Sequence, residues 1–231
     1  MFLIFWIMLT GFLSLAIYVS PFAARMIAEK RLRHICRREH VLILTYDDGP
    51  SVVTTPRLLD LLAEMGAKGT FFLLGQRVQS TPQVLRRLQD EGHELASHSQ
   101  DHLNAWKVAP WRSVVDVKRG FATLVKYGVD FGLFRPPYGK LNLLTWFTAV
   151  CYGVRFGWWT VVSGDTFNPL PDPDSIVQAV ERDGGGVVLM HDFDSDEVHS
   201  KYVLELTRRL LEKASVYGWK VCTLSEVRQL N

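Results

Sequence analysis

The segment VLILTYDDGP, residues 41–50, joins an apolar strand to a polar turn. Its first six residues form a continuous β-rich run, which is typical of a strand buried on both faces. Asp47 and Asp48 follow at once and precede a Gly-Pro turn. A helical pattern with Thr55 as its N-cap comes next and ends at Gly66. The folded body of the chain is therefore expected to begin with a strand, a polar loop and a helix.

Strand and helix patterns go on alternating to the end of the chain. Further strands are expected within GTFFLLG (69–75), HELASH (93–98), FGLFRPPYG (131–139), GWWTVVSGD (157–165), GGGVVLMHD (184–192) and WKVCTL (219–224). A helix is expected to begin at Pro82, and further helices are expected at residues 111–127, 142–151, 174–183 and 198–216. Such alternation argues for parallel strands joined by crossover helices, in a barrel or a doubly wound sheet.

The positions of the reactive side chains favour the barrel. They stand where strands end: Asp47, Asp48, His98, Arg135, Asp165 and His191. The carboxyl ends of parallel barrel strands meet at one face, where such folds place their chemistry. The glycine fingerprint of a dinucleotide-binding sheet is absent from the sequence. We therefore predict an α/β fold built as a TIM-like (β/α) barrel of seven or eight strands, complete or incomplete.

Composition supports a globular protein and excludes several classes. The chain has 231 residues, of which 48% are hydrophobic and 12% aromatic, too many for a disordered chain. A net charge of +2 gives no reason to expect a nucleic-acid partner. The three cysteines, Cys36, Cys151 and Cys222, are odd in number and far apart, so they predict no disulfide framework.

The N-terminus differs from the rest of the chain. Residues 1–24 carry no charged side chain, and as a helix they would be roughly 36 Å long, enough to cross a hydrocarbon core of about 30 Å. A buried core helix and a cleaved signal peptide are the alternatives. The signal peptide fits less well, because no Lys or Arg precedes the apolar run. We predict a transmembrane anchor, and hence a single-pass membrane protein.

A basic segment, residues 25–40, follows the apolar run and is predicted to be a juxtamembrane linker to a catalytic domain at residues 41–231. The positive-inside rule places that domain on the cytoplasmic side. The alternative is a basic collar that contacts anionic headgroups on either face. A cytoplasmic active site close to the bilayer would suit a polyprenyl-linked sugar, whereas an outward-facing site would suit peptidoglycan or an exported polysaccharide.

Two motifs carry acidic and imidazole groups. Asp47 and Asp48 could divide the work of a general base and a metal ligand if the turn re-aims one of them, and a solvated Asx turn is the alternative. In HSQDH, His98 and His102 are spaced i and i+4, so a coiled segment would let them share a metal ion with one carboxylate. A capped or core histidine pair is the alternative reading. His93 is interpreted as structural.

Two later motifs add a guanidinium and a further imidazole. In RPPYG, Arg135 can hold a carboxylate, and the backbone N–H of Tyr138 can face a developing oxyanion. In VVLMHD, His191 can act as a general acid near neutral pH, and Leu189 can line an apolar slot. Taken singly, these motifs fit a rigid turn and a helix-capping pair equally well.

The four motifs together resemble those of the polysaccharide deacetylase family (NodB homology, carbohydrate esterase family 4) over residues 40–225. That resemblance implies a distorted (β/α) barrel that removes acetyl groups from sugars with one divalent metal ion. Zinc is the expected ion, with cobalt, nickel or manganese as alternatives. The resemblance implies the following roles: Asp47 as general base; Asp48, His98 and His102 as metal ligands; Arg135 as the residue that orients Asp47; Tyr138 as oxyanion donor; His191 as general acid; and Leu189, Pro137 and Asp165 as substrate-binding residues.

The expected reaction is therefore removal of an N-acyl group, in the first place N-acetyl, from an amino sugar in a glycan or lipid-linked glycan precursor. Two alternatives are a non-catalytic carbohydrate-binding or scaffold relative and a deformylase of a lipid-linked amino sugar. A metal phosphoesterase is a weaker alternative, since two-metal centres need more ligands.

One stretch departs from the family pattern. Asn168 and Pro169 stand where the family usually has an Asp, which supports the general-acid histidine, and a Trp. A neutral Asn cannot stabilise an imidazolium, so His191 is expected to lose its proton more easily. Asp165, Asp192 or Asp194 could replace the missing carboxylate.

Overall fold

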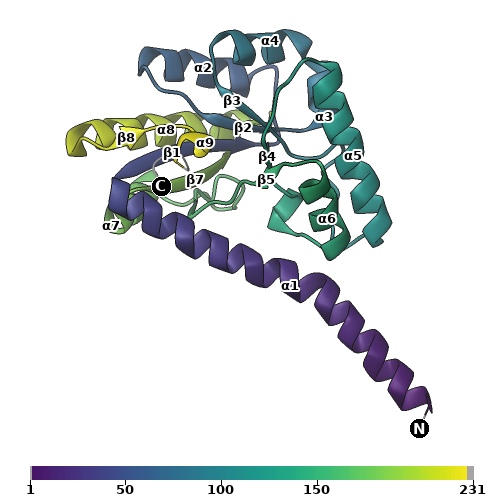
Figure 1. Cartoon of the computed structure of the whole chain (residues 1–231). Coiled ribbons are helices and arrows are strands. Elements are labelled where there is room, and N and C mark those ends of the chain that lie inside the picture. The colour runs from purple at the N-terminus through teal and green to yellow at the C-terminus, as the bar shows by residue number, and fades with distance from the viewer. Residues whose placement is uncertain (1, 228–231) are drawn as a thin grey trace.

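The computed structural model describes residues 2–227, except for the side chains of residues 3–5, 7–10 and 12–15. Its centre is a curved sheet in which every pair of neighbouring strands is parallel (Figure 1). The strands are β1 Val41–Asp47, β2 Thr70–Leu73, β3 Glu94–Ser97, β4 Leu133–Phe134, β5 Arg155–Phe156, β6 Val161–Val162, β7 Gly186–His191 and β8 Lys220–Val221. Their order is β5-β4-β3-β2-β1-β7-β6, with β8 paired to β1.

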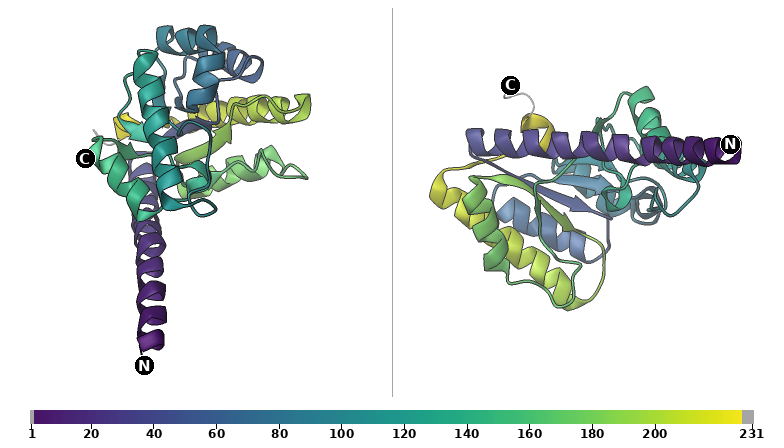
Figure 2. Two further views of the ribbon diagram at one scale, coloured as in Figure 1. Left: turned by 90° about the vertical axis from the view of Figure 1, so that its right-hand side faces the viewer. Right: turned by 90° about the horizontal axis from the view of Figure 1, so that it is seen from below.

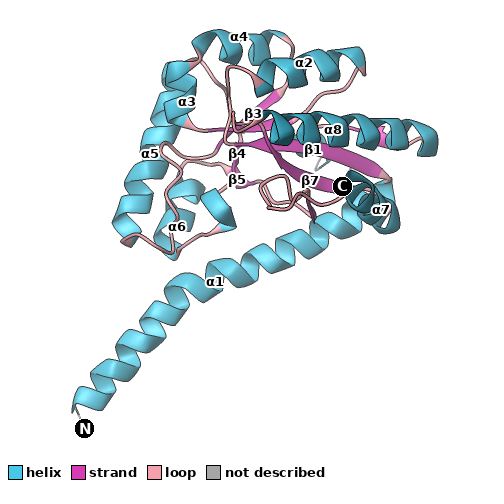
Figure 3. Ribbon diagram, turned by 180° about the vertical axis from the view of Figure 1, so that it is seen from behind, coloured by secondary structure: helices cyan, strands magenta, loops and turns pink. Residues whose placement is uncertain are grey.

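Helices pack against both faces of the sheet (Figure 3). They are α1 Phe2–Glu39, α2 Thr54–Glu64, α3 Gly75–Ser80, α4 Pro82–Asp90, α5 Pro110–Lys126, α6 Leu143–Cys151, α7 Pro173–Asp183, α8 Glu197–Tyr217 and α9 Leu224–Val227. A 3-10 turn, η1, spans Pro137–Gly139. The fold is thus a parallel α/β half-barrel, consistent with a (β/α)7 barrel, because β5 and β6 end the sheet without pairing to each other.

Alternation along β1 explains how the sheet separates two cores. Leu42, Leu44 and Tyr46 point into a cluster that packs under α2, α4, α7 and α8. Ile43 points to the opposite side, into a cluster with residues of α1, α5 and α6. Side chains two residues apart share a face of a strand, so Asp47 lies on the same face as Ile43. The candidate site therefore lies on the inner face of the half-barrel, at the carboxyl ends of the strands.

Helix α1 corrects the expectation of a transmembrane segment. Within the described residues, no helix combines the length and hydropathy that a bilayer-crossing segment needs. This contradicts the predicted transmembrane anchor at residues 1–24 and the predicted single-pass membrane localisation, including its cytoplasmic orientation. Part of that stretch, Met1 and the side chains of 3–5, 7–10 and 12–15, lies outside the described residues.

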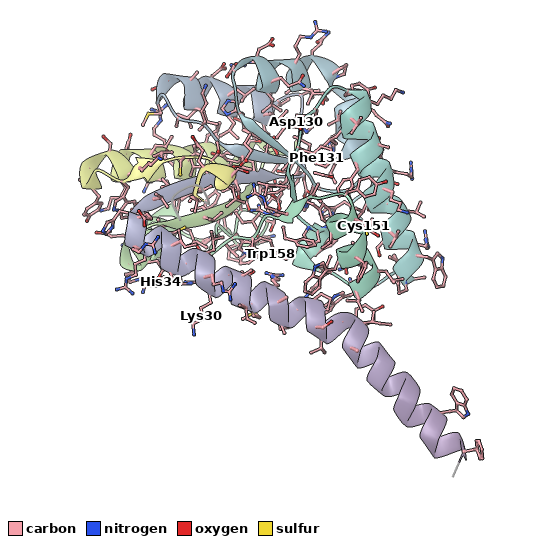
Figure 4. All side chains as sticks on the ribbon, viewed as in Figure 1. Lys30, His34, Asp130, Phe131, Cys151 and Trp158 are labelled. Carbon is pink, nitrogen blue, oxygen red and sulfur yellow. The ribbon has the colours of Figure 1, made fainter. Side chains whose placement is uncertain are left out.

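The second half of α1 packs against the half-barrel, which the uncharged N-terminal run does not indicate. Leu32 and Cys36 are buried in the cluster that contains Ile43. The second half of the helix therefore packs against the half-barrel. Lys30 and His34 point away from the sheet, whereas Trp158 lies between the sheet and α1 (Figure 4). The N-terminal half of the helix projects beyond the half-barrel (Figure 2).

Candidate active site

The four motifs meet at the carboxyl ends of the central strands. Asp47 ends β1, His98 directly follows β3, Arg135 directly follows β4, and His191 ends β7. Asp47 and His191 are register partners in neighbouring strands, which places them side by side at the sheet edge. Residues that are far apart in the sequence therefore surround one point, as the parallel topology predicts.

Three of the side chains form a compact ligand set. Asp48 Oδ1 lies 3.4 Å from His98 Nε2 and 3.2 Å from His102 Nε2. One ligand atom from each of the three lies within 4.8 Å of the others. Asp48 Oδ1 is buried, and no hydrogen-bond partner for it is found among the described residues. Because a buried carboxylate oxygen without a partner is costly, and two imidazoles face it, the set fits one divalent cation.

Unusual backbone conformations bring these ligands together. Asp48, Ser99 and His102 have φ angles of 71°, 74° and 58°, in the left-handed region that non-glycine residues rarely adopt. Asp48 thereby leaves the strand geometry that would direct it away from Asp47. The segment from His98 to His102 is a loop, so the two histidines meet without the helical turn that their i, i+4 spacing suggests.

His98 is held in one orientation. Its Nδ1 lies 2.7 Å from the carbonyl oxygen of Arg135, and an N–H donated there leaves Nε2 free to face Asp48. Burial, followed by the charge of His102, holds the pKa of His98 well below its usual range. Burial also lowers the pKa of His102, against the opposing charge of Asp48. Both imidazoles are therefore neutral at pH 7, the form that binds metal ions.

Asp47 is paired with a fully buried arginine. Arg135 donates from Nη1 to Asp47 Oδ1 at 2.7 Å and to Thr45 Oγ1 at 2.9 Å. Its Nε donates to the carbonyl oxygen of Gly157 at 2.9 Å, so the guanidinium is fixed from several sides. Burial raises the pKa of Asp47 to about 6, although the Arg135 charge opposes that rise. Such a carboxylate is ionised at neutral pH and still accepts a proton readily.

His191 has a carboxylate partner, and that partner is Asp165. Asp165 Oδ1 lies 2.9 Å from His191 Nδ1, and Oδ2 accepts the backbone N–H of His191 at 2.6 Å. Ser163 donates from its hydroxyl to Asp165 Oδ1 at 2.8 Å and orients the carboxylate further. Burial lowers the pKa of His191, but Asp165 and the nearby charges outweigh it and raise the pKa to about 9.

The expected consequence of Asn168 is therefore wrong. Asn168 is exposed, and its neutral side chain does not leave His191 without a charged partner, because Asp165 takes that place. The other two carboxylates do different work. Asp192 accepts a hydrogen bond from Thr55 Oγ1 at 2.6 Å, and Asp194 accepts backbone N–H groups at the start of α2.

The RPPYG loop lies against the ligand set. Tyr138 has a φ of 57°, and its ring centroid is 4.5 Å from that of His102. Pro137 is buried, and Leu189 is buried in β7, two residues before His191 and on the same face of the strand. The structure thus brings every candidate residue of the sequence analysis to one end of the half-barrel.

Two residues of this region were not singled out as site residues from the sequence. Trp159 lies 5.2 Å from the Arg135 guanidinium, measured to its ring centroid, and Arg25 of α1 reaches the carbonyl oxygen of Gly139. Arg25 begins the basic run, and Trp159 belongs to an aromatic pair. Neither pattern indicates the contact that is observed, and Arg25 and Gly139 lie 114 residues apart in the chain.

Comparison with known proteins identifies the family. The family described as "Polysaccharide deacetylase" matches residues 34–157. A peptidoglycan-N-acetylglucosamine deacetylase from Bacillus cereus is 32% identical over 191 residues, which cover 82% of this chain and 88% of that protein. The chain belongs to the polysaccharide deacetylase family. It is accordingly a hydrolase of the deacetylase type, acting on carbon–nitrogen bonds of amides, in a family that is generally metal-dependent.

Two further relatives support this assignment. A chitooligosaccharide deacetylase from Sinorhizobium fredii is 34% identical over 64% of this chain and 70% of that protein. A family 4 carbohydrate esterase from Streptomyces lividans, solved in complex with acetate, superposes with a TM-score of 0.69 and 31% identity, covering 79% of this chain and 91% of that one. The half-barrel of this chain is therefore the fold of carbohydrate esterase family 4.

Proposed function

We propose that this chain is a metal-dependent deacetylase that removes the N-acetyl group from an amino sugar of a glycan. The observation that carries the proposal is the convergence of Asp48, His98 and His102 around a buried carboxylate oxygen, with Asp47 and His191 beside them. Asp48, His98 and His102 are proposed to hold one divalent cation, with zinc as the first choice. When bound there, the cation would polarise the amide carbonyl and lower the pKa of a water molecule.

Asp47 is proposed as the general base. Arg135 holds its Oδ1, so Oδ2 is the oxygen that remains to take a proton from the attacking water. A pKa of about 6 keeps that oxygen unprotonated at neutral pH and close to the optimum for proton transfer.

The remaining roles follow from the neighbouring groups. The backbone N–H of Tyr138 is proposed to donate to the oxyanion that develops on the carbonyl oxygen. His191 is proposed as the general acid: its Nδ1 is engaged by Asp165, so Nε2 carries the proton that the leaving amine takes. Leu189 and Pro137 are proposed to line the space for the acetyl group.

The proposed substrate class is a glycan that contains N-acetylglucosamine, such as peptidoglycan or a chitooligosaccharide. The relatives named above support this class, since their names state these substrates. The polyprenyl-linked precursor expected from the sequence depended on the membrane anchor, and without that anchor it has no separate argument.

The test is amine release by the purified full chain, loaded with zinc, from chitooligosaccharides and from peptidoglycan. Asp47→Asn keeps the size of the side chain but removes the base, so we expect kcat to fall by about a hundredfold or more. Ser215→Ala, which changes an exposed residue near the end of α8, serves as the control and should leave kcat unchanged. Unchanged turnover in Asp47→Asn would refute the assigned base. Binding of the glycans without any amine release from the wild type would favour the non-catalytic, carbohydrate-binding alternative.

A further inference from the structure

Helix α1 contacts the candidate active site through one side chain. Arg25 donates from Nη1 to the carbonyl oxygen of Gly139 at 2.7 Å. Its Nε donates to Glu29 Oε1 at 2.6 Å, one helical turn further along α1, and this ion pair orients the guanidinium. Gly139 directly follows Tyr138, whose backbone N–H is the proposed oxyanion donor. The N-terminal helix is thus joined to this loop one residue away from the proposed oxyanion donor.

The loop is shaped to accept this contact. Gly139 has a φ of 61°, and a Cβ atom added there would lie 2.2 Å from Arg25 Nη1 and 2.7 Å from the Trp159 ring. Those distances are too short for a side chain, so the space beside the loop is filled by Arg25 and Trp159. A glycine at residue 139 is therefore required both by the backbone conformation and by the arginine that packs on it.

The same arginine also contacts the residues that support the base. The Arg25 guanidinium lies 4.5 Å from the Trp159 ring centroid and 5.2 Å from that of Trp158, both within the range of cation–π attraction. Arg135, which holds Asp47, lies 5.2 Å from the same Trp159 centroid. Arg25 and Trp159 therefore connect α1 to the oxyanion loop and to the Arg135–Asp47 pair.

We propose that Arg25 is a positioning residue that fixes the loop 136–140, and with it the Tyr138 N–H, for catalysis. The inference deepens the proposed function and rests on it. Arg25 precedes the residues 34–157 that match the family, so this chain supplies the support for a family motif from a segment outside the match. A donor aimed at a developing charge must be held in place before the reaction, and Arg25 provides that restraint.

Two measurements on the zinc-loaded full chain test the proposal. In Arg25→Ala, hydrogen–deuterium exchange of the amides of residues 138–142 should speed up, because the loop loses its anchor. The kcat should fall about tenfold or more while KM stays within about twofold, because the lost restraint acts on the transition state. Arg25→Lys keeps a charged donor for the Gly139 carbonyl but loses the planar guanidinium. Its kcat should therefore lie between those of the wild type and Arg25→Ala.

Arg33→Ala is the matched control. Arg33 also joins α1 to the domain, by Nη1 to Asp183 Oδ2 and Nη2 to the carbonyl oxygen of Thr160, but it does not contact the loop. In Arg33→Ala, the hydrogen–deuterium exchange of residues 138–142 and the kcat should equal those of the wild type. Equal losses in both variants would mean that α1 only stabilises the fold, and would overturn the proposal, as would unchanged exchange or kcat in Arg25→Ala. If the wild type releases no amine, the proposed function fails, and the exchange data alone decide whether Arg25 orders the loop.

Discussion

At the scale of single residues, the site depends on strained backbone and buried charge. Tyr138, Asp48 and His102 all have positive φ angles, and all three belong to the candidate site. Strain of this kind costs free energy and persists where the surroundings enforce it, which is common at functional sites. The side chains of Asp47 and Arg135 are almost fully withdrawn from solvent, so their charges act at short range with little screening.

Asp165→Asn should move the pH profile of the reaction. Burial lowers the pKa of His191, and Asp165 is the main one of the carboxylates that raise it to about 9, so removing the Asp165 charge should lower that pKa. The general acid must be protonated, so the alkaline limb of kcat/KM should shift to lower pH, with less activity at pH 8 and a smaller loss at pH 6. Initial rates from pH 5 to 10 measure the shift.

Asn168→Ala is the control for that profile. Asn168 stands at the position where the family usually has the supporting Asp, but it is exposed in this chain. Its replacement should leave the alkaline limb in place. A shift in Asn168→Ala and none in Asp165→Asn would reverse the assignment of the partner of His191.

At the scale of secondary-structure elements, most helices and strands agree with the pattern of apolar residues. The predicted helix at 142–151 appears as α6 with Asn142 as its N-cap, since the Asn142 side chain accepts the N–H of Thr145. The short elements β5, α3 and α9 were not expected, because two to six residues are too few to show a period. Element ends that depend on distant residues were also predicted less well.

The start of α2 is an example. The sequence predicts Thr55 as its N-cap, but the Thr55 hydroxyl donates to Asp192 instead. Asp194 satisfies the first N–H of the helix, that of Thr54 at 2.9 Å, and also accepts the N–H of Val52 at 3.0 Å, just before the helix. A carboxylate 140 residues further along the chain therefore takes the place of a local cap.

Asp194→Ala should destabilise the fold by about 1 kcal/mol, because the orphaned N–H groups lose their acceptor. Urea unfolding of the full chain, followed by circular dichroism, gives the free energy of unfolding. Ser195→Ala, at the neighbouring exposed position, should change it by less than about 0.5 kcal/mol. Equal stability of the two variants would contradict a capping role for Asp194.

At the scale of the whole molecule, a cation would join two separate loops. Asp48 follows β1, whereas His98 and His102 follow β3, and β2 lies between these strands in the sheet. A ligand that binds the folded state alone stabilises it, by about 2.7 kcal/mol when its concentration is one hundred times Kd. Metal loading should therefore affect both stability and turnover.

Zinc is expected to raise the Tm of the chelator-treated protein and to restore its amine release. His102→Asn should abolish that rise in Tm, and Asn tolerates the left-handed backbone at this residue. His34→Ala, which removes an exposed histidine on α1 (Figure 4), should respond to zinc as the wild type does. A zinc response that survives in His102→Asn and is lost in His34→Ala would place the cation elsewhere. Thermal scans with and without added zinc measure the change in Tm of each variant.

The sequence by itself determined the α/β class, the alternation of strands and helices, and which polar residues stand at the strand ends as candidates for the site. These follow from local information: the apolar period of each element, and polar residues at strand ends that parallel topology must bring to one edge. Only the tertiary structure decided that Asp165 partners His191, that Asp194 caps α2, and that Arg25 contacts Gly139. The physical reason is that such contacts join segments distant in the sequence, and nothing in the local pattern of either segment specifies its partner.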